Sequence, residues 1–360
     1  MNFKHTFLLL IFFSLFLSCD KTDEVCCAIP TTKILEIRGV DMSLLPEVRQ
    51  SGLLIKNENN QAEDMLQTLK NAGVNVIRLR IWKNPSANDA VSGFESVKTV
   101  TNELKNKGFK VMLTVHYSDW WADPGSQVKP AQWQGISFNQ LKDSVFIYTK
   151  KICDEINPQY IQIGNEINNG FIYPEGSYNN QNQFKQLLNA GASAVRASNS
   201  STKIIIHYAG VDGAESFFNY IQGVDFDIIG ISYYPQWHGK NLSIVQTQLT
   251  SISNTVNKPI FIAETSYPFT LGWNDYTNNV LGLSSQILPE FEPTTTGQKQ
   301  FLESIKTITK NVPKAIGFCY WGAEWISYKG NTATNGSPWE NQALWDFQNK
   351  AVPAIQVFGE

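Results

Sequence analysis

Short apolar runs recur eight times along the chain, and polar segments separate them. Buried parallel strands read as such near-continuous apolar runs, because both of their faces are covered. The candidate strands are residues 35–42, 74–82, 110–117, 160–167, 203–208, 226–234, 259–265 and 315–321. The pattern therefore predicts eight strands.

Apolar residues at helical spacing occupy most intervals between these runs. They predict helices over residues 65–72, 97–104, 184–195 and 301–308, with Gly73 and Gly108 closing the first two. Strands alternating with helices eight times indicate an α/β fold, a (β/α)8 TIM barrel in a single domain. A doubly wound open sheet is the alternative, but neither GxGxxG after the first strand nor a Walker A motif supports nucleotide binding.

The N-terminus has the pattern of an export signal. Lys4 and His5 precede an apolar run over residues 7–17, which is too short to span a membrane comfortably. The tract Phe16-Leu-Ser-Cys19 resembles a bacterial lipobox, so Cys19 is the expected lipidation site; an ordinary secretory signal is the alternative. We expect a lipoprotein signal peptide over 1–18, a tether over 19–33 and a catalytic domain over 34–360. The protein is then secreted and lipid-anchored to the outer membrane or cell surface.

Composition narrows the class of partner. A hydrophobic fraction of 42% with 17% charged residues is typical of a globular protein. The net charge of -3 gives no support for a nucleic-acid partner, and only the lipid anchor is expected to contact a membrane. A monomer is the default expectation.

Two glutamates end predicted strands at equivalent places. Glu166 follows Asn165 near the end of one apolar run, and Glu264 ends another. Because catalytic groups of parallel barrels lie at the carboxyl ends of the strands, the two are expected to meet. Paired carboxylates cleave glycosidic bonds, one as general acid and one as nucleophile. The alternative is that each caps a helix or faces water.

Polar and aromatic residues also end the other strands. Arg78 and Tyr233 are expected to keep the nucleophile ionised, and Asn165 to bind a sugar 2-hydroxyl. Flat aromatic rings suit the faces of pyranose sugars. The candidate substrate-binding residues from these strand ends are Arg78, His116, Trp120, Trp121, Asn165, His207, Tyr233 and Trp321.

Other hydrolytic and metal motifs are absent from the sequence. It contains neither GxSxG nor HExxH, and no EF-hand spacing. Asn and Asp residues within 273–279 and 331–341 have oxygen ligands for Ca²⁺, but such residues more often form turns. Whether a metal binds stays open here.

Five tracts together resemble glycoside hydrolase family 53, the arabinogalactan endo-β-1,4-galactanases. They are Asn75-Val-Ile-Arg-Leu-Arg-Ile-Trp82, Val115-His-Tyr-Ser-Asp-Trp-Trp-Ala-Asp-Pro124, Gly164-Asn-Glu166, Ala263-Glu-Thr265 and Trp339-Glu-Asn-Gln-Ala-Leu-Trp345. The second tract is the most specific, and the resemblance covers nearly all of residues 34–350.

The resemblance implies a retaining (β/α)8 enzyme that hydrolyses β-1,4-galactan and requires no cofactor. It implies Glu166 as acid/base and Glu264 as nucleophile, and it adds Asp119 to the substrate-binding residues. A structural calcium occurs in the last long loop of some bacterial members. The alternatives are another retaining β-glycanase, such as a mannanase or xylanase, or a glycan-binding surface lipoprotein without activity.

Overall fold

Eight parallel strands close into a barrel in the computed structural model, which describes residues 33–199 and 201–360. Each strand pairs with its neighbours in the chain, and β1 pairs with β8 to close the ring. The strands are β1 (Ile37–Asp41), β2 (Val76–Ile81), β3 (Lys110–Val115), β4 (Tyr160–Ile163), β5 (Lys203–Ala209), β6 (Ile228–Ser232), β7 (Ile260–Thr265) and β8 (Ala315–Tyr320). All eight predicted strands and the barrel are confirmed.

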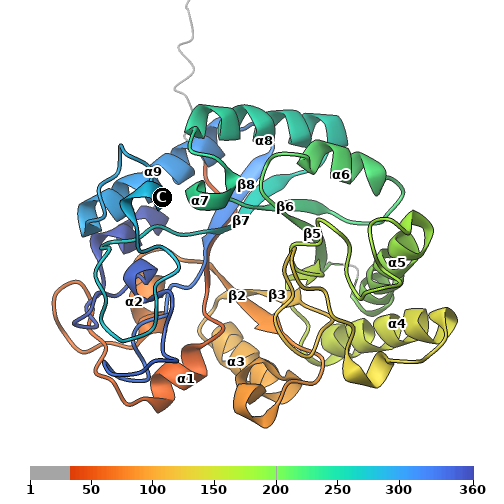
Figure 1. Ribbon diagram of the computed structural model, residues 1–360, viewed down its shortest axis with the longest axis horizontal. Coiled ribbons are helices and arrows are strands. Elements are labelled where there is room, and N and C mark those ends of the chain that lie inside the picture. Colours follow the sequence, from red (N-terminus) through yellow and green to blue (C-terminus); the bar gives the residue numbers. More distant parts are fainter. Residues whose placement is uncertain (1–32, 200) are drawn as a thin grey trace, which may run out of the picture. The chain divides into compact units, whose positions relative to one another are not determined.

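Helices surround the strands in Figure 1. They are α1 (Leu45–Gln50), α2 (Met65–Asn71), α3 (Phe94–Asn106), α4 (Phe138–Glu155), α5 (Gln181–Ser198), α6 (Ala214–Tyr220), α7 (Pro235–His238), α8 (Leu242–Val256) and α9 (Thr295–Asn311). The four predicted helices correspond to α2, α3, α5 and α9. Gly73 and Gly108 follow the ends of α2 and α3 with φ of +97° and +81°, as expected of glycines that stop helices.

Residues 34–360 form one compact unit. The predicted signal peptide, Cys19 and the tether as far as residue 32 lie outside the described residues. Within the described part, no helix has the length and apolar character needed to cross a bilayer.

The barrel interior changes from apolar to polar along the strands. Side chains alternate between the two faces of a strand, so Val76, Arg78 and Arg80 of β2 share the inner face. Val76 belongs to a buried apolar cluster with residues such as Met112 and Phe261. Arg78 lies two residues further toward the carboxyl ends and is buried among polar side chains. The apolar layer closes the bottom of the barrel, and the polar layer forms the floor of its open end.

The connections at the two ends of the barrel differ in length. At the amino ends of the strands, α2 is joined to β2 by residues 72–75 and α3 to β3 by 107–109. At the carboxyl ends, long segments follow β3, β4, β7 and β8. These segments form the walls above the polar floor.

Candidate active site

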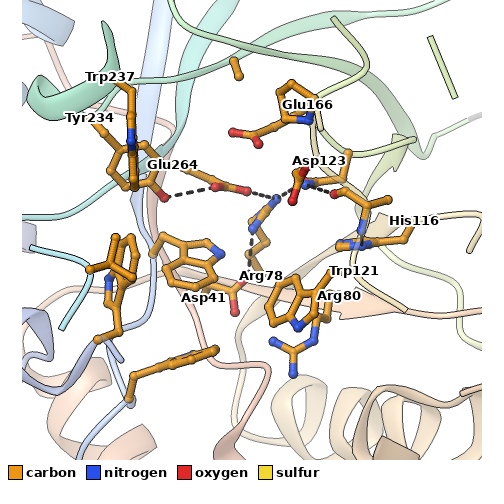
Figure 2. A pocket seen from close by; sticks show the side chains of 18 of the residues that line it. Asp41, Arg78, Arg80, His116, Trp121, Asp123, Glu166, Tyr234, Trp237 and Glu264 are labelled. Carbon is orange, nitrogen blue, oxygen red and sulfur yellow. Dashed lines mark hydrogen bonds and ion pairs between the residues drawn. The ribbon is translucent and has the colours of Figure 1, made fainter. Parts of the chain in front are cut away.

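A pocket of about 640 Å³ opens at the carboxyl ends of the strands. Residues from every strand end or the segment that follows contribute to it, and Figure 2 shows their side chains converging. Of the residues proposed from sequence, it is lined by Arg78, His116, Trp121, Asn165, Glu166, Glu264 and Trp321. The pocket therefore brings together both glutamates and five of the nine other candidates.

Backbone geometry after β4 directs Glu166 into the pocket. Gly164 has φ +84°, and a Cβ there would lie 2.5 Å from the Ile167 side chain, so only glycine fits. Glu166 itself has φ +47°, an unfavourable conformation for a residue with a side chain. Such strain is characteristic of functional sites, and here it turns the carboxyl group toward the mouth of the barrel.

The two glutamates meet across the pocket. One carboxylate oxygen of Glu166 and one of Glu264 lie within 4.8 Å of each other. Glu264 is 6% exposed, and Glu166 is partly exposed at the pocket surface. Figure 2 shows the two carboxyl groups facing the same space.

Arg78 organises the floor through four hydrogen bonds. Its Nη1 donates to Asp41 (2.8 Å), and its Nη2 donates to Glu264 (2.6 Å) and Asn165 (3.0 Å). Its Nε donates to Gln162 at 2.7 Å. A fully buried guanidinium between two carboxylates favours their ionised forms. Arg78 thus favours the carboxylate form of Glu264 and fixes its position.

A tyrosine hydroxyl also supports Glu264, but it belongs to Tyr234. Tyr234 Oη donates to Glu264 Oε2 at 3.0 Å, whereas Tyr233 Oη donates to the Gly239 carbonyl. The sequence assignment of this contact to Tyr233 is wrong. Neighbouring residues of an extended segment point to opposite sides, so only one of the two tyrosines can face the pocket.

Protonation differs between the two glutamates. Burial, followed by the Glu264 charge, raises the pKa of Glu166 to about 8. Burial also raises the pKa of Glu264, but the Arg78 charge and the Tyr234 hydrogen bond oppose that effect. A proton shared by this pair therefore resides on Glu166. Near neutral pH the site holds one carboxylic acid and one carboxylate.

The two predicted site histidines have different positions. His116 lines the pocket, and its Nδ1 accepts hydrogen bonds from Trp82 Nε1 (3.2 Å) and the Ala122 amide (3.0 Å). Its proton is then on Nε2, and burial lowers its pKa well below the usual value, so it is neutral. His207 is fully buried behind Glu166 and does not line the pocket.

Tryptophans form much of the pocket wall. Trp321 contacts Trp339 and Trp325, with ring centroids 4.7 Å and 5.1 Å apart. Among the described residues, the indole N–H groups of Trp325 and Trp339 have no hydrogen-bond partner, although both atoms are buried. Buried donors without partners are costly, so these two N–H groups are an unmet cost of this aromatic wall.

The remaining candidates lie beside the pocket. Trp120 is 51% exposed and packs on Trp82, with ring centroids 4.8 Å apart. It lines a neighbouring cavity that shares Arg80, Trp121 and Trp325 with the first, so the depression continues past the glutamates. Asp119 accepts the Ala131 amide through Oδ2 and lines neither cavity.

Several pocket residues were not identified from the sequence. Asp41 and Arg80 end or nearly end their strands, so the same strand-end rule could have found them. Tyr234, Trp237 and His238 lie in or directly before the short helix α7, and the remaining three lie in long loops, whose course no periodicity reveals. The pocket residues missed are Asp41, Arg80, Asp123, Tyr234, Trp237, His238, Trp325 and Trp339.

Comparison with known proteins identifies similar chains over the whole described unit. Residues 37–358 match the family model described as glycosyl hydrolase family 53. An endo-β-1,4-galactanase of Bacillus subtilis (strain 168) is 32% identical, over 89% of this chain and 85% of its own. An arabinogalactan endo-β-1,4-galactanase of Cellvibrio japonicus (strain Ueda107) is 31% identical, over 89% of each chain. The Ignisphaera aggregans GH53 catalytic domain superposes with a TM-score of 0.86 at 38% identity, covering 92% of this chain and 97% of that one.

Proposed function

The chain belongs to glycosyl hydrolase family 53, and from this premise we propose that it is an endo-acting, retaining β-1,4-galactanase. Its substrate class is the β-1,4-linked galactan of type I arabinogalactan, which forms side chains of pectin. The relatives at 31–32% identity are galactanases by name and span most of this chain. The arrangement of the glutamates around the pocket supports the same activity.

The reaction proceeds in two displacements. Glu264 attacks the anomeric carbon, while Glu166 gives its proton to the departing glycosidic oxygen. A galactosyl ester of Glu264 results, and Glu166 is left as a carboxylate. It then takes a proton from a water molecule, whose oxygen attacks the same carbon and releases Glu264. The product has the anomeric configuration of the substrate, and both glutamates regain their starting states.

The spacing of the glutamates carries this proposal. Retaining enzymes hold their two carboxyl groups roughly 5–5.5 Å apart, whereas inverting enzymes need about 6.5–9.5 Å to admit a water molecule. One oxygen of each glutamate within 4.8 Å of the other agrees with the shorter, retaining separation. Glu264 ionised beside Arg78 suits the nucleophile, and Glu166 with its raised pKa suits the acid.

Substrate specificity is tested by hydrolysis of three polysaccharides. We expect rapid release of reducing ends from linear β-1,4-galactan and at least about 100-fold slower release from β-mannan and xylan. Mannose differs from galactose at C2 and C4, and xylose differs at C4 and lacks the hydroxymethyl group, so each forfeits buried hydrogen bonds. Solution viscosity should fall early, as internal cleavage requires. Faster cleavage of mannan or xylan would identify another β-glycanase. Binding without cleavage of any of the three would identify a glycan-binding protein.

Two carboxylates within residues 273–279 and 331–341, where the sequence left a calcium site open, accept backbone amides. Asp275 accepts the Thr277 and Ser337 amides, and Glu340 accepts the amides of Asn274 and Asp275. The last loops are thus tied together by carboxylate–amide contacts, and the proposed reaction uses no cofactor.

We also propose that Cys19 carries the lipid that holds the enzyme on the outside of a membrane. The support is the lipobox-like tract Phe16-Leu-Ser-Cys19 and the polar segment after it. Full-length protein expressed in a Gram-negative host should incorporate radiolabelled palmitate and sediment with membranes. Cys19→Ser should abolish both, whereas the matched variant Cys26→Ser should change neither. Labelling that persists in Cys19→Ser would contradict the assignment.

A further inference from the structure

Four side chains form a continuous hydrogen-bonded row behind Glu166. Asn165 Oδ1 lies 3.0 Å from Arg78 Nη2 and 3.2 Å from His207 Nδ1. His207 Nε2 lies 2.8 Å from Ser232 Oγ, which lies 2.5 Å from Glu166 Oε1. His207 and Ser232 are fully buried and Asn165 is 6% exposed, so water does not offer these groups alternative partners. The proposed mechanism gives no role to Ser232 or His207.

Arg78 fixes the direction of the first bond in this row. A guanidinium has five N–H donors and no acceptor, so the Asn165 atom that faces it must be the oxygen. The other end of the amide agrees, because Asn165 Nδ2 donates to the Ala122 carbonyl at 2.8 Å. Asn165 therefore presents only an acceptor to His207.

The direction then passes along the row to Glu166. His207 must donate to Asn165 from Nδ1, and because burial and the Arg78 charge lower its pKa well below the usual value, it is neutral. Its Nε2 is therefore an acceptor, and Ser232 must donate to it. A hydroxyl has a single proton, so Ser232 can only accept from Glu166. That last bond requires a proton on the Glu166 carboxyl group.

We propose that Arg78, Asn165, His207 and Ser232 form a one-directional hydrogen-bond chain that keeps Glu166 protonated in the free enzyme. This inference rests on the proposed function, in which Glu166 is the general acid. Ser232 and His207 are positioning residues, since neither faces the pocket. They favour the protonated form of Glu166 and do not themselves exchange a proton with the substrate.

The chain also favours the return of the proton in the second displacement. When Glu166 has given its proton to the leaving oxygen, the Ser232 hydroxyl turns to the new carboxylate. His207 Nε2 then loses its donor and faces an oxygen lone pair. Uptake of a proton from the attacking water by Glu166 restores every bond of the row. The carboxylate is therefore a stronger base than it is without His207.

Other charged and titratable groups also face Glu166. Glu264 of β7 and Asp123 after β3 favour its protonated form, whereas the Ser232 hydroxyl, whenever it donates, and Arg78 of β2 favour the carboxylate. Tyr234, after β6, is neutral and donates to Glu264. All of these groups remain when His207 is replaced, so a substitution of His207 isolates the effect of the hydrogen-bond chain on the protonation of Glu166.

The tautomer of His207 tests the proposed hydrogen-bond chain in the wild-type protein itself. The protein has four histidines, so ¹⁵N-histidine labelling of the whole protein gives few imidazole signals, and loss of one set in His207→Gln assigns those of His207. We expect the Nδ1–H tautomer of a neutral ring between pH 5 and 7 in the wild type. An Nε2–H tautomer or a doubly protonated ring overturns the proposal. This readout requires no substrate, so it stays decisive if galactan proves not to be the substrate.

The pH profile of kcat/KM gives a second test. Its alkaline limb reports Glu166 in the free enzyme. In His207→Leu, Ser232 can donate to the Glu166 carboxylate without giving up a hydrogen bond to His207, so the carboxylate is more stable. The alkaline limb should then shift by about one pH unit to lower pH, a roughly tenfold loss of rate on the alkaline side. The matched variant His207→Gln has one acceptor for Ser232 and one donor for Asn165, and it should keep the wild-type limb. If the alkaline limb lies at the same pH in both variants, whether at the wild-type position or shifted from it, the proposal is overturned. If His207→Leu does not fold, the proposal still requires a wild-type alkaline limb in His207→Gln and the Nδ1–H tautomer of His207 in the wild type.

Discussion

Replacing Glu264 with alanine should lower kcat on galactan by on the order of 10⁴-fold or more, equivalent to about 5 kcal/mol of barrier. The physical reason is that the first displacement loses its nucleophile. Arg78 donates to Glu264 at 2.6 Å and Tyr234 at 3.0 Å, so the site orients this carboxylate specifically. Initial rates on linear galactan measure the loss.

Two further variants separate loss of chemistry from loss of structure. Glu264→Gln keeps a side-chain oxygen for Arg78 and Tyr234, so it should fold, bind galacto-oligosaccharides and turn over as slowly as the alanine variant. Azide added to Glu264→Ala can occupy the vacated space and attack C1, giving a galactosyl azide with inverted configuration. Residual kcat above about 1% of wild type in well-folded protein would refute Glu264 as the nucleophile, since nucleophile losses exceed this level.

Glu166→Gln should show a loss that depends on the leaving group. Protonation matters most for a sugar alkoxide, so we expect a fall of roughly 10³-fold on galactan, within the range typical of general acids. An aryl β-glycoside with an acidic phenol leaves without protonation, so its first displacement should slow less than about tenfold. Stopped-flow release of the phenol measures that step directly.

The pH profile supplies the control for the acid assignment. In the wild type, kcat/KM should fall above about pH 8, where Glu166 loses its proton, and the fall at low pH should follow protonation of Glu264. Both carboxyl groups have a pKa raised by burial, so the working range lies between their two values, with Glu166 at the alkaline end. Glu166→Gln should remove the alkaline limb and retain the acid limb. Equal losses on galactan and on the aryl glycoside would count against Glu166.

The contacts among pocket residues show where sequence reasoning succeeded and failed. Arg78 and Glu264 were found because a strand places its inward residues toward the open end of the barrel, and Glu166 because it directly follows a strand that ends there. Tyr233 was predicted in place of Tyr234 because a pattern of apolar residues does not locate the exact end of a strand. That end decides which of two neighbouring residues points inward. His207 was placed in the binding surface, yet the side chains of the neighbouring strands bury it behind Glu166.

The sequence by itself determined the alternation of strands and helices, the barrel and the two carboxylates at strand ends, because these follow from periodicity along a single segment. Tertiary structure alone decided which long-loop tryptophans form the wall, and that Asp275 and Glu340 bind amides. It alone aligned Arg78, Asn165, His207 and Ser232 into one row. Those contacts join residues from β2, the turn after β4, β5 and β6. Their distances are set by how four strands stagger around the barrel, which no local pattern of residues encodes.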